Sequence, residues 1–532
     1  MTVSDLKAPP AMFWDYRASK RSDKLLAILF SISFIHALFV LMIAITNPIL
    51  EDHSFRQAQT ALSVYWLLHG GPILRYETPV VGYPWSVPFE FPLYQWLVAI
   101  LAAIGISIEV AARLVSFTFY LGIIGLIRIL FLLLNLSTRT FVITGTLFLC
   151  SPLYLYWSRT VMIEPCALFL STLWFVLLIL AIRSRKSIVL ATTGAILAGS
   201  AAALTKATTL GAFLAIGGSV ILVEAYGAWR RDELWMRLPL LAGWVSACIL
   251  PLLVGFAWLG YTDVVKAMNP IGQSMTSGAL FSWNFGTLQQ RFSVNLWGWV
   301  IPRRMVPETL GYGFIFGVVS IIYALVSRRH VRLILACLSA FILPILVFPG
   351  LHSTHSYYQY ENSVFLIAAV GLGIAAVWDS GRRILGALTL LLLVTGQYTY
   401  FYRDYSRYLF ADYSDDRILR LAALAREKTK PDESLLVLGL AWGSELPYLS
   451  QRKALELPVW IDKGLMQRIF ADPQAFLDDY RLGAIAYCSD GLWGLRRYGD
   501  NVLVDKFLAG REVLAEVSDC RLVSPSRAAD PR

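Results

Sequence analysis

Three short polar stretches of the chain gather side chains that can move protons or hold anions. They are EDHSFRQAQTA over 51–61, SRTVMIEP over 158–165 and HSTHSYYQYE over 352–361. Their candidate residues are Glu51, Asp52, His53, Arg56, Gln57, Arg159, Glu164, His352, His355, Tyr357 and Tyr358. A carboxylate can take a proton from an attacking hydroxyl group, and arginine or histidine can hold a phosphate. Brought together, the three stretches would form a site for displacing a phosphate leaving group.

Each stretch also has a plainer structural interpretation. Glu51 and Asp52 can stabilise a helix N-terminus, and Glu164 followed by Pro165 is a helix-start signal. Arg56 can pair with Glu164 or with a lipid headgroup, and the two histidines can be ordinary interfacial residues. The chemical interpretation therefore depends on elements that bring the three stretches to one place.

The composition identifies those elements as membrane helices. The chain has 532 residues, of which 57% are hydrophobic and 15% charged, and its mean hydropathy is +0.59. Soluble domains carry about 25% charged and 45–50% apolar residues. The net charge of +10 would suggest nucleic acid as a partner in a soluble protein. Here most basic residues fall in short loops between apolar runs, which indicates membrane topology and excludes a nucleic-acid partner.

Eleven apolar runs predict about eleven membrane-spanning helices. They lie at about 25–46, 112–134, 141–157, 166–182, 188–205, 207–226, 238–259, 311–326, 333–348, 362–378 and 384–400. About 20 apolar residues suffice to cross a bilayer as a helix. The fourteen-residue run 93–106 is shorter, and we expect an interfacial or re-entrant helix there. From 54 onwards the spacing predicts an amphipathic helix lying on the membrane.

Basic loops predict the orientation of these helices. RASKRSDK before the first run, RSRK at 183–186, WRRDELWMR at 229–237, SRRHVR at 327–332 and GRR at 381–383 all belong in the cytoplasm by the positive-inside rule. The N-terminal segment 1–24 is then cytoplasmic, and the run from 25 is a retained first span rather than a cleaved signal. The first outer loop, 47–111, and all three polar stretches fall on the periplasmic or extracytoplasmic side of a plasma (inner) membrane.

The polar character of residues 401–532 predicts a small soluble domain after the membrane part, which spans 25–400. Charged helical sequence is followed by short runs typical of strands, so we expect an extracytoplasmic α/β domain. Cys488 and Cys520 lie in this part and can pair if it is extracytoplasmic. The other four cysteines lie in or beside apolar runs and are expected to pack there.

In sequence the membrane part resembles glycosyltransferases of the GT-C fold, in the superfamily of dolichyl-phosphate-mannose protein mannosyltransferases and aminoarabinose transferases (glycosyltransferase family 39 and relatives). The resemblance covers residues 25 to about 400. It rests on EDHSFRQAQTA, on EFPLYQWLVAILAAIGISIEVAARL, on SRTVMIEPCALF and on HSYYQY. Their order and spacing carry more information than any one of them.

The resemblance implies roles for the candidate residues. An acid of the first loop, Glu51 or Asp52, would be the catalytic base, and Glu164 would be the acid of the second loop. Relatives often have a lysine that contacts the carrier phosphate, and here that place reads Glu90. We therefore expect the phosphate contacts at Arg56, Arg159 and His355. The remaining binding residues would be His53, Gln57, His352, Tyr357 and Tyr358.

The predicted function is transfer of a sugar from a polyprenyl-phosphate carrier to a lipid or glycan acceptor, with inversion by direct displacement. Some relatives bind a divalent metal, for which Glu51, Asp52 and Glu164 would be the ligands, and others need no cofactor. Three alternatives stay open: a protein acceptor, a transporter or flippase of lipid-linked sugars, and a non-catalytic assembly subunit. Transporters usually show two hydropathic halves, and no such symmetry is evident here.

Overall fold

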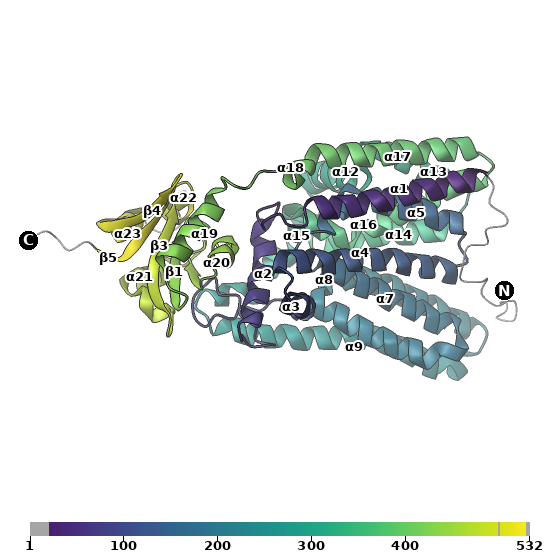
Figure 1. Cartoon of the computed structure of the whole chain (residues 1–532). Coiled ribbons are helices and arrows are strands. Elements are labelled where there is room, and N and C mark those ends of the chain that lie inside the picture. The colour runs from purple at the N-terminus through teal and green to yellow at the C-terminus, as the bar shows by residue number, and fades with distance from the viewer. Residues whose placement is uncertain (1–20, 498–500, 528–532) are drawn as a thin grey trace, which may run out of the picture.

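The computed structural model describes residues 21–497 and 501–527. A long bundle of helices is followed by a small α/β domain that lies beyond one end of the bundle (Figure 1). The predicted fold class, a polytopic helical membrane protein with a small C-terminal α/β domain, is confirmed. Residues 1–20 of the N-terminal segment that is predicted to be cytoplasmic lie outside the described residues.

Within the described residues, seven helical stretches are long and apolar enough to cross a membrane. They are α1 (Arg21–Ile43), α4 (Ile108–Leu133), α7 (Glu164–Arg183), α8 (Ile188–Arg230), α9 (Leu234–Ala267), a stretch that ends in α13 (Phe314–Val326), and α17 (Arg383–Asp404). Shorter apolar helices complete the bundle, namely α5 (Thr138–Cys150), α14 (Val331–Val347) and α16 (Ser363–Asp379). Helix α16 is buried along almost its whole length, so it forms the centre of the bundle.

Helix α8 is a hairpin of two membrane helices. Its backbone leaves the helical region at Lys206 (φ −165°, ψ 94°). Gly199 and Gly217 both lie against Trp174, although a straight helix would place them about 27 Å apart at 1.5 Å per residue. The two halves must therefore run side by side in opposite directions, which agrees with the two separate spans predicted at 188–205 and 207–226. With α8 counted as two and the three short helices included, the described part of the chain gives the eleven helices predicted.

The first loop, between α1 and α4, covers one end of the bundle. Helix α2 (Ser54–Leu68) lies across this end, and α3 (Leu93–Ala103) lies beside it (Figure 1). The apolar run at 93–106 is thus a helix too short to cross a membrane, in agreement with the prediction. The loop places the first polar stretch at the mouth of the bundle.

The C-terminal domain, from α19 (Arg417–Lys428) onwards, contains a five-stranded sheet in the order β2-β1-β3-β5-β4. Strands β1 (Glu433–Leu438), β2 (Ala454–Glu456) and β3 (Arg481–Cys488) are parallel, whereas β5 (Cys520–Arg527) is antiparallel to β3 and to β4 (Arg511–Val517). The helices are α19, α20 (Glu445–Ser450), α21 (Lys463–Ala471), α22 (Leu492–Leu495) and α23 (Asn501–Leu508). Helix α18 (Ser406–Leu409) connects this domain to α17.

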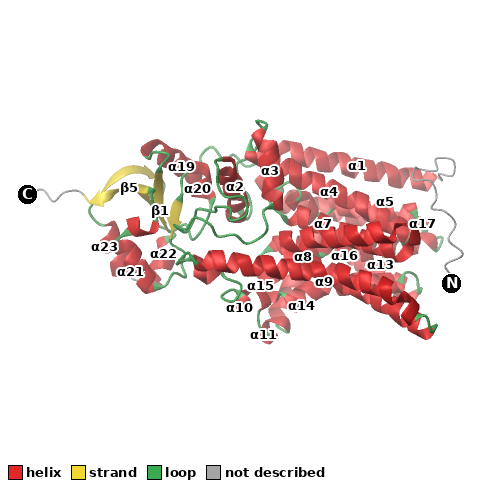
Figure 2. Ribbon diagram, turned by 90° about the horizontal axis from the view of Figure 1, so that it is seen from below, coloured by secondary structure: helices red, strands yellow, loops and turns green. Residues whose placement is uncertain are grey.

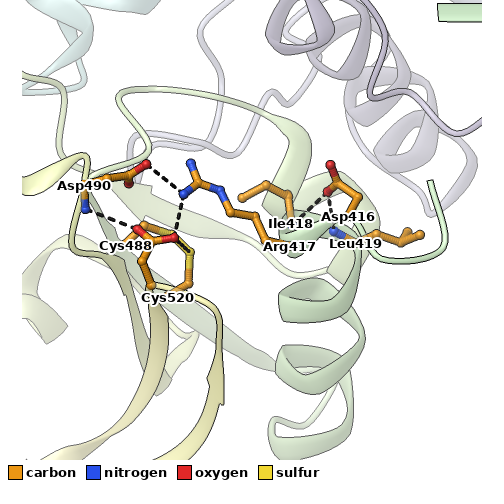
Figure 3. Close-up of a disulfide and its surroundings, with 8 residues drawn as sticks. Asp416, Arg417, Ile418, Leu419, Cys488, Asp490 and Cys520 are labelled. Atoms are coloured by element: carbon orange, nitrogen blue, oxygen red, sulfur yellow. Dashed lines mark hydrogen bonds and ion pairs between the residues drawn. A yellow bond between two sulfur atoms is a disulfide. The ribbon is translucent and has the colours of Figure 1, made fainter. Parts of the chain in front are cut away.

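A disulfide joins the middle of this sheet. Cys488 and Cys520 are opposite each other on β3 and β5 and are bonded (Figure 3). Beside them, Arg417 at the start of α19 donates to Asp490 at 2.8 Å and to Asp519 at 2.6 Å. The disulfide ties β3 to β5, and the ion pairs of Arg417 hold the start of α19 beside these two strands.

The first loop also extends the sheet of the C-terminal domain at its β2 edge. Ala454 N donates to Pro79 O at 3.0 Å and Glu456 N donates to Val80 O at 2.6 Å. The neighbouring Lys453 ammonium lies 2.7 Å from a carboxylate oxygen of Glu77 and within about 5 Å of the ring centroids of Trp66, Trp85 and Tyr480. Helices α2 and α20 lie between the sheet and the bundle (Figures 1 and 2). The first loop, which carries the first polar stretch, is thereby held between the helix bundle and the C-terminal domain.

Candidate functional site

The three polar stretches meet around His53. Its ring centroid lies 5.6 Å from that of Trp157, 5.3 Å from that of His355 and 5.1 Å from that of Tyr357. Trp157 ends α6 (Pro152–Trp157), which leads into the second stretch. The third stretch runs from the end of α15 (Pro349–Thr354) through the short helix η7 (Ser356–Glu361). The fold therefore brings together segments that are up to about 300 residues apart in the sequence.

Glu51 is the centre of a buried ion-pair network. Its carboxylate accepts hydrogen bonds from Arg159 at 3.0 Å on both oxygens and lies 3.9 Å from Arg113. Asn47 also donates to it, at 3.2 Å. All three charged side chains are almost fully buried. Two arginines thus neutralise Glu51. We expected Arg159 to contact the carrier phosphate, but in the structure it binds the Glu51 carboxylate.

Asp52 lies in a different environment, although it is the next residue. Its side chain is partly exposed, and its carboxylate accepts one described hydrogen bond, from the His53 amide at 3.1 Å. The main chain of Asp52 is held firmly, since its N–H donates to Tyr156 Oη at 3.0 Å and its carbonyl accepts from Gln57 at 2.8 Å. Gln57 also accepts from the Val161 amide at 3.1 Å and so ties the first stretch to the second. The arrangement fixes Asp52 and leaves its carboxylate available.

Arg56 is paired with Glu90, the residue found where relatives often have lysine. One guanidinium nitrogen lies 2.9 Å from each carboxylate oxygen of Glu90, and another donates to Gln59. Burial favours the neutral form of Arg56, but the Glu90 carboxylate outweighs it and holds the pKa of Arg56 above its ordinary value. Arg56 therefore keeps its charge at the edge of the site.

Lys206, at the tip of the α8 hairpin, is a residue of the site that was not among the candidates predicted from the sequence. Its ammonium lies 3.1 Å from Glu164 and 3.7 Å from Glu361, and 4.1 Å from the ring centroid of Tyr358. Glu361 in turn lies 3.3 Å from His352 Nε2. Glu164 is thus buried inside the bundle and linked to the third stretch. A lone lysine between two apolar runs was the signal available in the sequence.

Arg304 is the second site residue that the sequence analysis did not identify. It lies at the end of η5 (Asn295–Met305), a π-helix, which is a rare element often found at functional sites. Its guanidinium donates to the carbonyls of His352 and, at 2.8 Å, of Ser353. Among the described contacts of Arg304 there is no carboxylate, so its positive charge is not neutralised by an ion pair.

Cationic groups act on His355. Burial first, and then repulsion of its protonated form by His53, Arg304, Arg56 and Lys206, lower the pKa of His355 to about 4. We call Arg56, Lys206 and Arg304 the cationic cluster. The pKa of His53 is also lowered, mainly by burial and partly by Arg304, while Asp52 and Glu164 oppose the shift. Arg56 and Lys206 already have carboxylate partners, so Arg304 is the group of this cluster that is best placed to attract an anion.

The acids proposed as metal ligands have cationic partners. In the part of the chain that the structure describes, no three His, Cys, Asp or Glu side chains form a group that could hold a metal ion. Glu51 faces Arg159 and Glu164 faces Lys206, so two of the three predicted ligands are already neutralised. Glu51 and Glu164 therefore do not fit a metal site.

Comparison with solved structures identifies the fold as that of the GT-C glycosyltransferases, which are polytopic membrane proteins. ArnT from Cupriavidus metallidurans bound to undecaprenyl phosphate matches with a TM-score of 0.64 and 13% identity, over 96% of this chain and 99% of that chain. The Archaeoglobus fulgidus oligosaccharyltransferase matches with a TM-score of 0.53 and 13% identity, over 91% of this chain and 71% of that chain. The mycobacterial arabinofuranosyltransferase AftD matches with a TM-score of 0.50 and 14% identity, over 97% and 40% of the two chains.

No family model matches the sequence, and no curated protein sequence matches it either. The likeness is therefore one of structure, and it confirms the fold that the four sequence motifs predicted.

Proposed function

We propose that the chain is a membrane glycosyltransferase that moves a sugar from a polyprenyl-phosphate carrier to a glycolipid, polysaccharide or related envelope acceptor. The observation that carries this proposal is the position of Asp52, a carboxylate with a fixed main chain that acts on His53 together with Arg304. A base and an anion-binding group at one mouth of a membrane bundle suit displacement of a lipid phosphate.

On the donor side, Arg304 is our choice for the main contact with the carrier phosphate. Its guanidinium is oriented by two backbone carbonyls, and no carboxylate competes for it among its described contacts. Arginine can bind two phosphate oxygens at once. Lys206 and Arg56 have carboxylate partners, so they would attract the carrier phosphate at longer range rather than contact it.

An apolar groove supports a lipid carrier. It has a volume of about 350 Å³ and lies between the first loop and the helices α8 and α9, lined by Leu74, Phe91, Leu204, Val254, Ala257, Trp258 and Tyr261. Leu204 is two residues from Lys206, and the indole of Trp258 donates to the carbonyl of Phe89, next to Glu90. An isoprenoid tail in this groove would have its phosphate near the site, and the related ArnT structure binds undecaprenyl phosphate.

In the proposed step, Asp52 accepts the proton of an acceptor hydroxyl group as its oxygen attacks the anomeric carbon. The bond between that carbon and the phosphate oxygen breaks, and the electron pair leaves with the carrier phosphate. A single displacement of this kind inverts the anomeric configuration. We place the step on the extracytoplasmic face, which the disulfide and the distribution of basic loops support.

The test is a deletion of the gene in its native host, followed by mass spectrometry of lipid extracts and envelope glycans. We expect a polyprenyl-phosphate sugar to accumulate and one glycolipid or polysaccharide to lose that sugar. The protein with Asp52→Asn should not restore the product. Loss of the sugar from proteins only would favour the protein-acceptor alternative. Accumulation of the donor on the cytoplasmic face, with the sugar missing from every acceptor, would favour a flippase.

A binding assay tests the donor side separately. Purified full-length protein in lipid nanodiscs is titrated with undecaprenyl phosphate, and Arg304→Met should weaken binding about tenfold or more, since a charge-assisted contact contributes about 1.5–3 kcal/mol. Arg329→Met is the matched control, because Arg329 belongs to a basic loop that follows α13. Equal affinities for the wild type and Arg304→Met would contradict the assignment of Arg304.

A further inference from the structure

Glu308 is a buried carboxyl group in the site for which the proposed transfer step has no use. It lies in α12 (Val306–Leu310), directly after the π-helix, and is 7% exposed. Its Oε2 atom is buried and has no hydrogen-bond partner among the described residues. A buried polar atom without a partner costs stability and calls for an explanation, and a ligand group that binds it is one such explanation.

The fold holds Glu308 in this place. Gln397 on α17 donates at 3.1 Å to the carbonyl of Thr309, and the Thr309 hydroxyl donates at 2.8 Å to Ser363 on α16. Two residues later, Gly311 packs against the backbone of Gly396 so closely that it has no room for a side chain. Helix α12 is thereby fixed to α17 near the end of the bundle that faces the C-terminal domain (Figure 1).

Glu308 lies on a helix that packs against the element next to Asp52. Helix α12 contacts α6, which carries Tyr156, and the Tyr156 hydroxyl accepts the Asp52 amide. The ring of Tyr156 lies 4.5 Å from that of Tyr405. The charged groups that act on Glu308 are Arg304 on its own segment, Asp52 on the first loop and Asp404 on α17.

The environment favours a neutral carboxyl group at position 308. Arg304 is the cation that acts on it, but its guanidinium donates to backbone carbonyls and forms no ion pair with Glu308 among the described contacts. Two neighbouring carboxylates and the burial both disfavour a further negative charge. A neutral carboxyl group can donate a hydrogen bond, which a carboxylate cannot.

The groups that act on His355 and on Glu308 differ. His53, Arg304, Arg56 and Lys206 act on His355, which suits the carrier phosphate, whereas Arg304, Asp52 and Asp404 act on Glu308. A phosphate group on an acceptor beside Glu308 would be repelled by Asp52 and Asp404.

We propose that Glu308 binds the acceptor, donating a hydrogen bond from its neutral carboxyl group to an uncharged hydroxyl group of a glycan-type acceptor. The inference rests on the proposed function and adds the class of the acceptor group and the residue that holds it. Holding one hydroxyl group of the acceptor would orient a second towards Asp52.

The experiment uses membrane vesicles from the native host, which contain donor and acceptor, with variants of the full chain replacing the wild type. Consumption of the polyprenyl-phosphate sugar is measured by mass spectrometry from pH 6 to pH 9. Glu308→Leu should reduce the rate about tenfold or more, and Glu308→Gln should retain more activity than Leu because an amide still donates. The wild-type rate should fall at alkaline pH as Glu308 ionises, and the Gln variant should not show that fall.

A stability measurement distinguishes a ligand-binding residue from a structural one. The Leu variant should melt at or above the wild-type temperature, because it removes an unsatisfied buried group, whereas the matched variant Glu51→Gln should melt lower. A lowered melting temperature for Glu308→Leu, wild-type rates for it, or an unchanged pH profile for the Gln variant would each overturn the proposal. Wild-type vesicles that consume no donor would instead refute the proposed function.

Discussion

Glu51 and Asp52 are adjacent acids that lie in different environments. The sequence leaves open which of them is the base, since both are carboxylates in the same loop. The difference is made by Arg113 and Arg159, which lie 62 and 108 residues after Glu51 and neutralise it. Pairing between distant positions is set by tertiary packing, which no local pattern in a single sequence records.

We predict opposite outcomes for substitutions at these two acids. Asp52→Asn should fold normally but lose transfer by about 10²- to 10⁴-fold, because an amide cannot accept the proton. Glu51→Gln should destabilise the protein by about 3–5 kcal/mol, since two buried arginines lose their counter-ion. Melting curves and transfer rates of both variants in nanodiscs check this. A stable Glu51→Gln protein without activity would reverse the two assignments.

A second prediction at the residue scale concerns acid stability. The pKa of His355 in the folded protein is about 4, below the model-peptide value of 6.5 that applies to the unfolded chain. Between these values the unfolded chain binds more protons, so the stability that His355 contributes is lost as the pH falls from about 6.5 towards 4. The melting temperature should therefore fall over this range. The fall in melting temperature should be smaller in His355→Phe than in the wild type. An identical dependence of melting temperature on pH in the two proteins would contradict the burial of a neutral imidazole.

At the level of elements, the apolar runs predicted most of the bundle and missed the part that completes the site. Long runs between basic loops predict membrane helices, because the bilayer fixes their length. The hairpin at Lys206 could also be predicted from the sequence, because a single polar residue separates two apolar runs. The short helix that carries Glu308 could not be predicted, because its position depends on contacts with Gln397 and Gly396 of α17. The π-helix that carries Arg304 is a rare element that no pattern in the sequence indicated.

The contact between Gly311 and α17 gives a prediction at this scale. Gly311 has a φ of +68°, and a Cβ atom there would meet the backbone of Gly396 and Gln397. Gly311→Ala should cost at least about 1–3 kcal/mol and reduce transfer, because α12 would have to move. Gly211→Ala is the control, since nothing lies within 4 Å of the added atom in α8. Equal melting temperatures for the two variants would show that α12 is loosely held.

For the whole molecule, the arrangement of charge predicts which end faces the cytoplasm. Basic loops follow α7, α8, α13 and α16, whereas the polar stretches and the C-terminal domain gather at the mouth of the bundle. Alkaline phosphatase fused after residue 532 should therefore be active in a bacterial host, because it matures only outside the cytoplasm. Green fluorescent protein at the same position should not fluoresce after export by the Sec route. The reverse pattern would refute the proposed topology.

The hydrogen bonds between residues 79–82 and β2 have a consequence for engineering chimeras. A sheet cut from this chain at α19 would expose the main-chain edge that the first loop now covers, and bare edges invite aggregation. It would also lose Trp66 and Trp85 as neighbours of Lys453. The module that can be exchanged between related proteins is therefore discontinuous. Recombination should keep the C-terminal domain together with the first loop, and place the crossover points in α1 and α4.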